Sequence, residues 1–166
     1  AGGDGGGVYA TFGRVDANEL RGNLAASGGG IFAERNSTLI RNFVTSNRAS
    51  SGFGGGVYIN FWGTSVENEE FTGDTVTRNL TPDEKGNGGV FIVGYLFFEQ
   101  NNIHGNAGSQ LYNGNESESN PLFTPQCYWG TADKGAISRL IMDGHDDPQL
   151  GKVTFEPYSR EPIRLD

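Results

Sequence analysis

The sequence lacks any uninterrupted apolar run near 18 residues, so we expect no helix that inserts into a membrane. It holds one cysteine, Cys127, which cannot form an internal disulfide. We expect Cys127 to pack as a small apolar group, with a bridge to another chain as the alternative. Positive charge is scarce, because 12 Lys and Arg residues stand against 20 Asp and Glu residues. The net charge of −8 argues against nucleic acid and against an anionic membrane surface as partners.

Glycine, in contrast, is abundant, with 27 residues in 166. Much of it lies in a box of two or three glycines followed by alternating apolar and aromatic residues. The box occurs four times, at residues 5–10, 28–33, 54–59 and 88–92. Self-similarity at a period of a few tens of residues indicates a stacked repeat architecture. Because the chain begins inside a repeat and without methionine, we expect a processed product or a fragment.

A second pattern follows the boxes: an apolar residue, Asn at +3, an apolar residue at +5, Asn at +8 and a small residue at +10. Three copies supply three asparagine pairs: Asn18 and Asn23, Asn42 and Asn47, Asn101 and Asn106. A further copy, in which acids replace both amides, is assigned to Val66, Glu69, Phe71 and Asp74. Asparagines that recur at one place in stacked β-turns can bond to one another as a ladder.

Short, glycine-rich and β-branched units favour a coil of β-strands over a helical repeat. The prediction is an all-β parallel β-helix of about five to six turns over residues 1–131. Residues 132–166 would close the same domain with a short capping helix and a tail strand. Ile137, Leu140 and Ile141 have helical spacing, and Thr131 or Asp133 is a suitable N-cap. We expect the helix to cover strand edges at the C-terminal end and the N-terminal end to stay open.

The glycine box, the asparagine spacing and the C-terminal segment together carry a resemblance. The segment reads Cys-Tyr-Trp-Gly-Thr at 127–131, Asp-Asp-Pro-Gln-Leu-Gly at 146–151 and Pro-Ile at 162–163. The chain thus resembles right-handed parallel β-helix proteins of the pectin-lyase-like class, especially the Gly-Gly-rich repeats of surface proteins. The resemblance implies the fold and an extracellular or cell-surface location. It leaves function open, because this fold hosts lyases, hydrolases, adhesins and inert spacers.

Alternation within the boxes predicts one aromatic column. If Val57 and Ile59 point inward, their neighbour Tyr58 points outward. The same argument places five rings in one stripe: Tyr9, Phe32, Tyr58, Phe91 and Tyr112. Such a stripe would serve as a contact surface for another subunit or as a stacking platform for glycan. The alternatives are that a loop or the C-terminal tail covers it, or that the rings belong to the core.

Three Asn-x-Ser/Thr sequons predict possible glycosylation, at Asn36, Asn79 and Asn115. We place all three in turns and outside the ladder columns.

Two groups of acids are candidate sites for chemistry. Asp143, Asp146 and Asp147 lie close together beside His145; we interpret them as part of the closing loop, with Ca²⁺ binding as the alternative and no metal site assigned. Neighbouring residues of an extended chain point in opposite directions, so the two adjacent aspartates make a poor acid and base pair. Glu69 and Asp74, with Glu67 and Glu70 nearby, would hold a cation or form a solvated acidic face.

These observations favour a non-catalytic structural or adhesive module that associates with copies of itself into a fibre or surface array. An uncovered coil end that meets a complementary end generates filaments when the contact does not close. The alternative is a domain that binds or processes polysaccharide as a lyase or hydrolase. No catalytic set and no cofactor is predicted.

Overall fold

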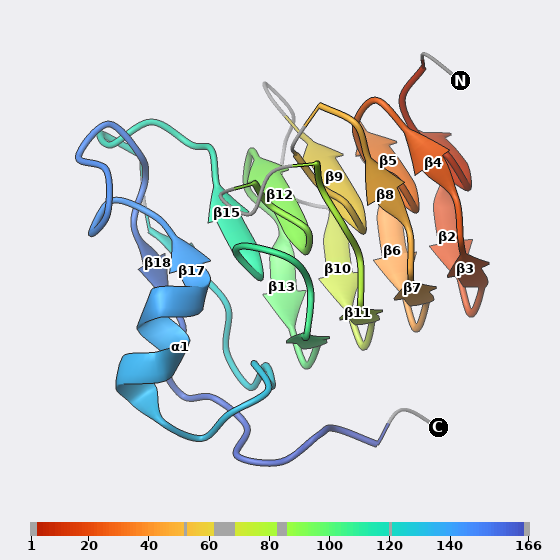
Figure 1. The fold of residues 1–166 in the computed structure, drawn as a ribbon. Coiled ribbons are helices and arrows are strands. Elements are labelled where there is room, and N and C mark those ends of the chain that lie inside the picture. The colour runs from red at the N-terminus through yellow and green to blue at the C-terminus, as the bar shows by residue number, and fades with distance from the viewer. Residues whose placement is uncertain (1–2, 52, 62–68, 83–85, 120, 165–166) are drawn as a thin grey trace.

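The protein is a parallel β-solenoid with one short helix at its C-terminal end (Figure 1). The computed structural model describes residues 3–51, 53–61, 69–82, 86–119 and 121–164. Successive turns of the chain lie over one another from the N-terminal end of the stack to the helix. Neighbouring strands in the described sheets are all parallel, as the repeat predicted.

Three long sheets and two short ones make up the walls. The first sheet contains, in spatial order, β1 (Val8–Thr11), β5 (Ile31–Glu34), β9 (Val57–Asn60), β12 (Val90–Val93), β15 (Leu111–Asn113) and β17 (Ile141–Met142). The second contains β2 (Arg14–Asp16), β6 (Thr38–Ile40), β10 (Glu70–Thr72) and β13 (Phe97–Glu99). The third contains β3 (Glu19–Arg21), β7 (Phe43–Thr45), β11 (Thr75–Thr77) and β14 (Asn102–His104). The short pairs are β4 (Leu24–Ala25) with β8 (Arg48–Ala49), and β16 (Leu122–Phe123) with β18 (Val153–Thr154).

The core is a set of apolar columns that run along the stack. In the first sheet, Ile31, Val57, Val90 and Leu111 lie in register and are fully buried. Each turn contributes only a few apolar side chains, so one turn alone could not bury them. Stacking makes the core continuous, which is why repeats of this kind fold together.

Sharp corners, one after each strand of the second sheet and one after each strand of the third, explain the asparagine spacing. The residue before each ladder position has a positive φ, and four such residues precede the first ladder: Ala17, Arg41, Gly73 and Gln100. Four more precede the second ladder: Gly22, Ser46, Arg78 and Gly105. One left-handed residue turns the chain between two strands, and the asparagine that follows then bonds to the turns above and below. Non-glycine residues adopt this conformation at some energetic cost, and the ladder bonds offset that cost.

The third copy of the repeat starts five residues later than the sequence pattern suggested. Phe71 pairs with Leu39 and with Phe98, so Phe71 takes the place assigned to Val66. Residue 66 itself lies outside the described residues, as does Glu67. The error arose because the repeat contains its own five-residue period, apolar-x-x-Asn-x, so a shift of five preserves most matches. The corrected copy begins with Phe71, Asp74, Val76 and Asn79.

The C-terminal segment covers the last turn. Helix α1 (Lys134–Leu140) begins at Asp133, whose Oδ1 accepts a hydrogen bond from the Ala136 N–H at 2.6 Å. Ile137 is its buried residue. Strand β17 then joins the first sheet beside β15, and β18 pairs with β16. Among the described residues, no helix is long and apolar enough to cross a bilayer.

Candidate functional site

Two ladders of polar side chains run through the stack. In the first, the Oδ1 of Asn42 accepts hydrogen bonds from the backbone N–H of Asn18 at 3.1 Å and from its Nδ2 at 3.2 Å. Asp74 receives the same pair of bonds from Asn42. The Oδ1 of Asn101 then accepts from the Asp74 N–H at 2.8 Å. Each ladder side chain therefore accepts hydrogen bonds from the ladder residue of the preceding turn.

The second ladder repeats this geometry through Asn23, Asn47, Asn79 and Asn106. Its amide groups also bond to backbone carbonyls, as when Asn47 Nδ2 donates to Leu20 O at 2.9 Å. Asn47 and Asn79 are fully buried. A buried amide with all of its groups bonded stabilises the turn, whereas removal of one member leaves buried partners unpaired.

Both ladders are closed at their C-terminal ends by residues that are not asparagine. The Oε1 of Gln110 accepts from the Asn106 N–H at 3.0 Å and from its Nδ2 at 2.8 Å. In the other ladder, Asn101 lies next to the thiol of Cys127, whose Sγ donates to Pro125 O at 3.6 Å. Burial raises the pKa of the Cys127 thiol to about 12, so the sulfur stays protonated. Gln110 and Cys127 are thus the last members of the two ladders, so a residue of the same chain covers each ladder at its C-terminal end.

At the N-terminal end both ladders stay open. No described residue donates a hydrogen bond to the Oδ1 of Asn18 or of Asn23. Strands β1, β2, β3 and β4 are the outermost strands of their sheets at this end of the stack (Figure 1). We call these four strands, with Asn18 and Asn23, the N-terminal coil face. An edge strand exposes a row of N–H and C=O groups that invite another strand to pair.

The side chains of the N-terminal coil face differ from those of the next turn. Leu20 is 8% exposed, whereas its neighbour Val44 is fully buried. Exposed Glu19 and Arg21 flank Leu20 on β3, and neither makes an ion pair with a described residue. On the adjoining strand β2, Asp16 bonds instead to Arg14 and Arg41, which together lower the pKa of its carboxyl. Among the described residues, the charges of β3 are therefore unpaired and those of β2 are paired.

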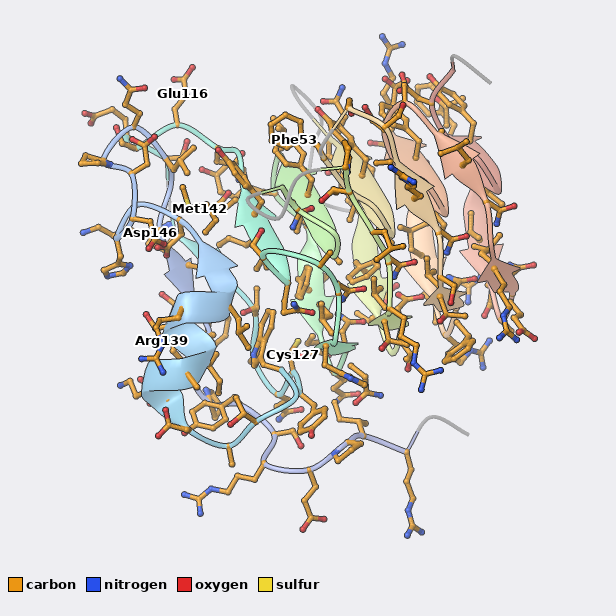
Figure 2. The ribbon with its side chains drawn as sticks, in the orientation of Figure 1. Phe53, Glu116, Cys127, Arg139, Met142 and Asp146 are labelled. Atoms are coloured by element: carbon orange, nitrogen blue, oxygen red, sulfur yellow. The ribbon has the colours of Figure 1, made fainter. Side chains whose placement is uncertain are left out.

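The five predicted rings do form one column on the side of the first sheet away from the core. Neighbouring ring centroids lie 5.3, 4.8, 4.6 and 5.1 Å apart, in the order Tyr9, Phe32, Tyr58, Phe91 and Tyr112. Phe53 packs across the column, against Phe91 at 4.9 Å and Tyr112 at 5.7 Å (Figure 2). A side chain from a glycine-rich loop thus covers part of the stripe.

This stacking decides what the column can bind. A sugar ring stacks on the open face of an aromatic ring, but each inner ring here already faces its neighbours in the column. Phe32 is accordingly buried, while Tyr9 at the end of the column is 52% exposed. The Tyr9 hydroxyl donates to Glu34 Oε2 at 2.6 Å, which raises the pKa of the phenol. The one stacking face left open at the N-terminal end belongs to Tyr9.

One of the three sequons lies in a ladder column, contrary to expectation. Asn79 follows the corner residue Arg78 and is a buried member of the second ladder. Asn115 is also buried, and its Nδ2 donates to Gly94 O at 2.9 Å and Asn113 Oδ1 at 2.8 Å. A glycan is attached through this nitrogen, so neither site is compatible with modification in the folded chain. Asn36 is half-buried at a corner with a positive φ.

The acids of the closing loop are occupied by the loop itself. Asp143 Oδ2 accepts from the Val153 N–H at 2.7 Å, and its Oδ1 accepts from the His145 N–H at 2.9 Å. Asp146 Oδ2 accepts from the Asp143 N–H, and Asp147 Oδ1 accepts from the Gln149 N–H. This loop lies beyond the end of helix α1 (Figure 2). Among the described residues, no group of three or more His, Cys, Asp or Glu side chains is placed to hold a metal ion.

The acids of the third turn do not form a solvated face, contrary to expectation. Glu69 and Asp74 are both buried. Glu69 Oε1 accepts from the Asn36 N–H at 3.0 Å, and Asp74 belongs to the first ladder. Both carboxyls therefore bind the backbone of the preceding turn. Glu70 lies on β10 and accepts a hydrogen bond from the Thr72 hydroxyl.

Sequence reasoning missed an apolar groove between β13 and β16. Phe97 on β13 is 68% exposed, and Phe123 on β16 also projects into solvent. The groove is lined by both rings together with Leu96, Pro121 and Pro125. Nothing in the repeat pattern marks it, because Phe97 occupies an outward position that is Arg, Thr or Glu in the other turns. Comparison with known proteins adds no assignment: no family model matches the chain, and neither curated proteins nor solved structures gave a match.

Proposed function

We propose that the chain is a non-catalytic structural or adhesive module that associates with copies of itself. The observation that carries the proposal is how the polar side chains of the coil are used: ladder asparagines bond to one another, and the acids of the closing loop bond to backbone N–H groups. Exposed apolar rings such as Phe97 and Phe123 remain on the surface for contact with another copy.

We further propose that the coil is a right-handed β-helix of the pectin-lyase-like class. Support comes from the closing segment, which forms a helix and a strand that return to the last turns of the coil. The glycine boxes also support the proposal, because they resemble the Gly-Gly-rich repeats of surface proteins of this class. Close contacts explain the boxes: a Cβ on Gly30 would lie 2.5 Å from Val44 Cγ1 and 2.7 Å from Gly56 O.

A non-catalytic role agrees with how the polar groups are used. The asparagines bond to one another, and the acids of the closing loop bond to backbone N–H groups. A general acid or base needs a carboxyl that can reach a substrate. The polar groups described above stabilise turns instead.

An extracellular or cell-surface location fits a structural module of this class. A glycan on Asn36 would be compatible with that location, because Asn36 lies at a half-buried corner and outside both ladders. The proposal requires no metal and no cofactor.

Sedimentation velocity of the purified chain over a hundredfold range of concentration tests the proposal. We expect the weight-average sedimentation coefficient to rise with concentration, and electron microscopy to show assembled particles. A chain that stays monomeric at the highest concentration would contradict self-association.

A second candidate function is polysaccharide binding, which the groove between β13 and β16 favours. Phe97 and Phe123 offer exposed ring surface beside Glu99, and exposed aromatic rings are the usual platforms for sugars. Titration with neutral and acidic oligosaccharides, for the wild type and for Phe97→Ala, tests this alternative. Leu80→Ala, which removes an exposed apolar side chain outside the groove, is the matched control.

A further inference from the structure

We infer that two copies of the chain dock side by side through the outward face of the second sheet, antiparallel and about a two-fold axis. Strand β2 of one copy then faces β13 of the other. We call the first and third residues of β2, β6, β10 and β13 the second-sheet face. The inference rests on the proposed self-association and names its contact, with a second copy of the chain as the occupant of this face.

The second-sheet face lies on the side of the coil and runs along the stack (Figure 1). In each of its strands the middle residue is buried, and the two residues beside it point outward. Stacking of one turn on another covers strand edges, whereas it leaves these outward side chains on the surface. The face is therefore open to a lateral contact.

An exposed aromatic ring marks the C-terminal end of this face. Phe97 on β13 is 68% exposed, the highest value for a large apolar side chain among the described residues, and Phe123 lies across the groove from it. Ile40 on β6 adds a half-buried apolar side chain to the same face. Aromatic side chains are enriched at the centres of protein interfaces, where they often carry much of the binding energy.

Parts of the same chain already contact the outward faces of the other two long sheets. On the first sheet the aromatic rings stack on one another, and Phe53 packs across them. On the third sheet the tail lies over β14, where Asn102 Nδ2 donates to Ile163 O at 2.9 Å and Asn102 Oδ1 accepts from the Ile163 N–H at 2.8 Å. The second-sheet face is thus the best candidate of the three for a second copy.

The charges of the second-sheet face are separated along the stack. At the N-terminal end Arg14, and Arg41 at the corner after β6, both pair with Asp16, which leaves a net charge of +1. Both arginine side chains are about half exposed. At the C-terminal end Glu70 and Glu99 add −2, and neither forms an ion pair with a described residue.

The whole chain has the same asymmetry. Residues 1–51, which form the first two turns, carry five arginines and four acids and so have a net charge of +1. Residues 52–166 carry seven basic residues and 16 acids, a net charge of −9 that completes the total of −8. Two copies that lie side by side in the same direction would bring their acidic parts together, and like charges in contact are costly. The charge distribution therefore favours antiparallel copies.

A two-fold axis that runs parallel to the strands, between β6 and β10, gives this arrangement. It places β2 against β13 of the second copy and β6 against β10. Arg14 then lies against Phe97 and Glu99 of the second copy. A guanidinium stacks on an aromatic face and pairs with a carboxylate, so both groups suit it. The symmetry repeats this contact at the other end of the interface.

The two-fold contact has a consequence for assembly size. An isologous contact uses the same patch on both copies, so it closes at a dimer. A fibre or surface array would then need a second contact elsewhere on the molecule.

Charge exchange between copies tests the inference. We would measure Glu99→Arg, Arg14→Glu and their equimolar mixture by sedimentation equilibrium at low salt. Each variant alone should raise the dimer dissociation constant about tenfold, because it places like charges against each other at both contacts. In the mixture one copy brings arginine at both positions and the other brings glutamate. The mixed dimer should therefore dissociate with a constant within about threefold of the wild type.

Removal of the exposed ring tests the apolar part of the contact. Phe97→Ala should raise the dissociation constant about tenfold, since it removes the aromatic anchor. Phe43→Ala, which removes an exposed ring from β7 of the third sheet, is the matched control and should leave the constant unchanged. Thermal denaturation should show every one of these surface variants to be folded.

Three results would overturn the inference, and they differ in what else they overturn. A wild type that remains monomeric at every concentration removes the proposed function as well. Association that ignores Phe97→Ala, or that mixing the two charge variants does not restore, leaves self-association standing but places it on another surface. Association that persists in Phe97→Ala while oligosaccharide binding is lost would assign this face to a glycan.

Discussion

Asp74 occupies the place of an asparagine above Asn42. Its Oδ1 accepts hydrogen bonds from the backbone N–H of Asn42 at 2.7 Å and from its Nδ2 at 2.8 Å. Its Oδ2 is buried and has no partner among the described residues. In neighbouring turns the corresponding Nδ2 donates to a carbonyl, from Asn42 to Val15 and from Asn101 to Phe71. The register places the Leu39 carbonyl at that point for Asp74, so Oδ2 faces an acceptor.

Stability should therefore depend on the protonation of Asp74. Burial raises the pKa of its carboxyl from 3.8 to about 7. Between these values the folded state holds a proton that the unfolded state has released, so the free energy of unfolding falls as pH rises. The loss is complete above about pH 7 and corresponds to roughly 4 kcal/mol.

Asp74→Asn isolates this effect, because Asn supplies an Nδ2 donor at every pH. We expect the unfolding free energy of the variant minus that of the wild type to grow from pH 4 to pH 7 and then level off. Urea denaturation of both proteins at several pH values measures this difference. The contributions of the other carboxyls are the same in both proteins and cancel when the two free energies are subtracted. A difference that is independent of pH would show that Asp74 is ionised in the folded chain.

Removal of an inner ladder residue should cost far more than removal of an outer one. Asn47→Ala breaks four hydrogen bonds and leaves several buried groups unpaired, so we expect a loss of about 3 kcal/mol. Asn18→Ala at the open end should cost below about 1 kcal/mol. Denaturation of the isolated monomer at low concentration makes the comparison. Equal costs would contradict the role of the ladder.

The positive φ of the corner residues predicts that glycine at these positions is more stabilising than any other residue. Ser46 and Gly105 hold equivalent corner positions, with φ of 57° and 65°. Ser46→Gly should raise the free energy of unfolding by up to about 1 kcal/mol, because it relieves the left-handed strain. Gly105→Ala should lower it by a similar amount through φ alone, since the nearest atom to the new Cβ would lie 3.5 Å away. Thermal denaturation of both variants measures the two signs, and a pair of the same sign would refute the explanation.

Glycosylation should be confined to one sequon. If the chain is secreted from eukaryotic cells, the folded product should carry glycan on Asn36 and on neither Asn79 nor Asn115. Both excluded side chains are buried and donate hydrogen bonds through the nitrogen that would bear the sugar. Peptide mapping of the secreted material measures occupancy, with Asn36→Gln as the control. Occupied Asn79 in soluble, folded protein would contradict the ladder assignment.

The sequence predicted the parallel β-solenoid because its signals are periodic. Glycine boxes recur in four turns and asparagine pairs in three of them, and the short helix over 134–140 follows from its apolar spacing and N-cap. The third copy was misplaced because its acid, Asp74, weakens the pattern that a five-residue shift otherwise preserves. Asn79 was then counted as a sequon instead of a ladder residue.

Features that occur once could not be predicted in this way. Gln110 and Cys127 close the ladders without matching the asparagine pattern. Phe53 is a single ring in a glycine-rich loop, and only the fold places it against the aromatic column. The free charges of Glu19 and Arg21 become visible only when β3 is known to be an edge strand.

Hydrogen exchange at two protein concentrations tests the central claim, self-association, most directly. At high concentration we expect a set of surface amides to exchange more slowly than at low concentration, because a second copy covers them. The buried amides of the ladders should exchange at the same rate at both concentrations. Exchange that is independent of concentration throughout the described residues would contradict self-association.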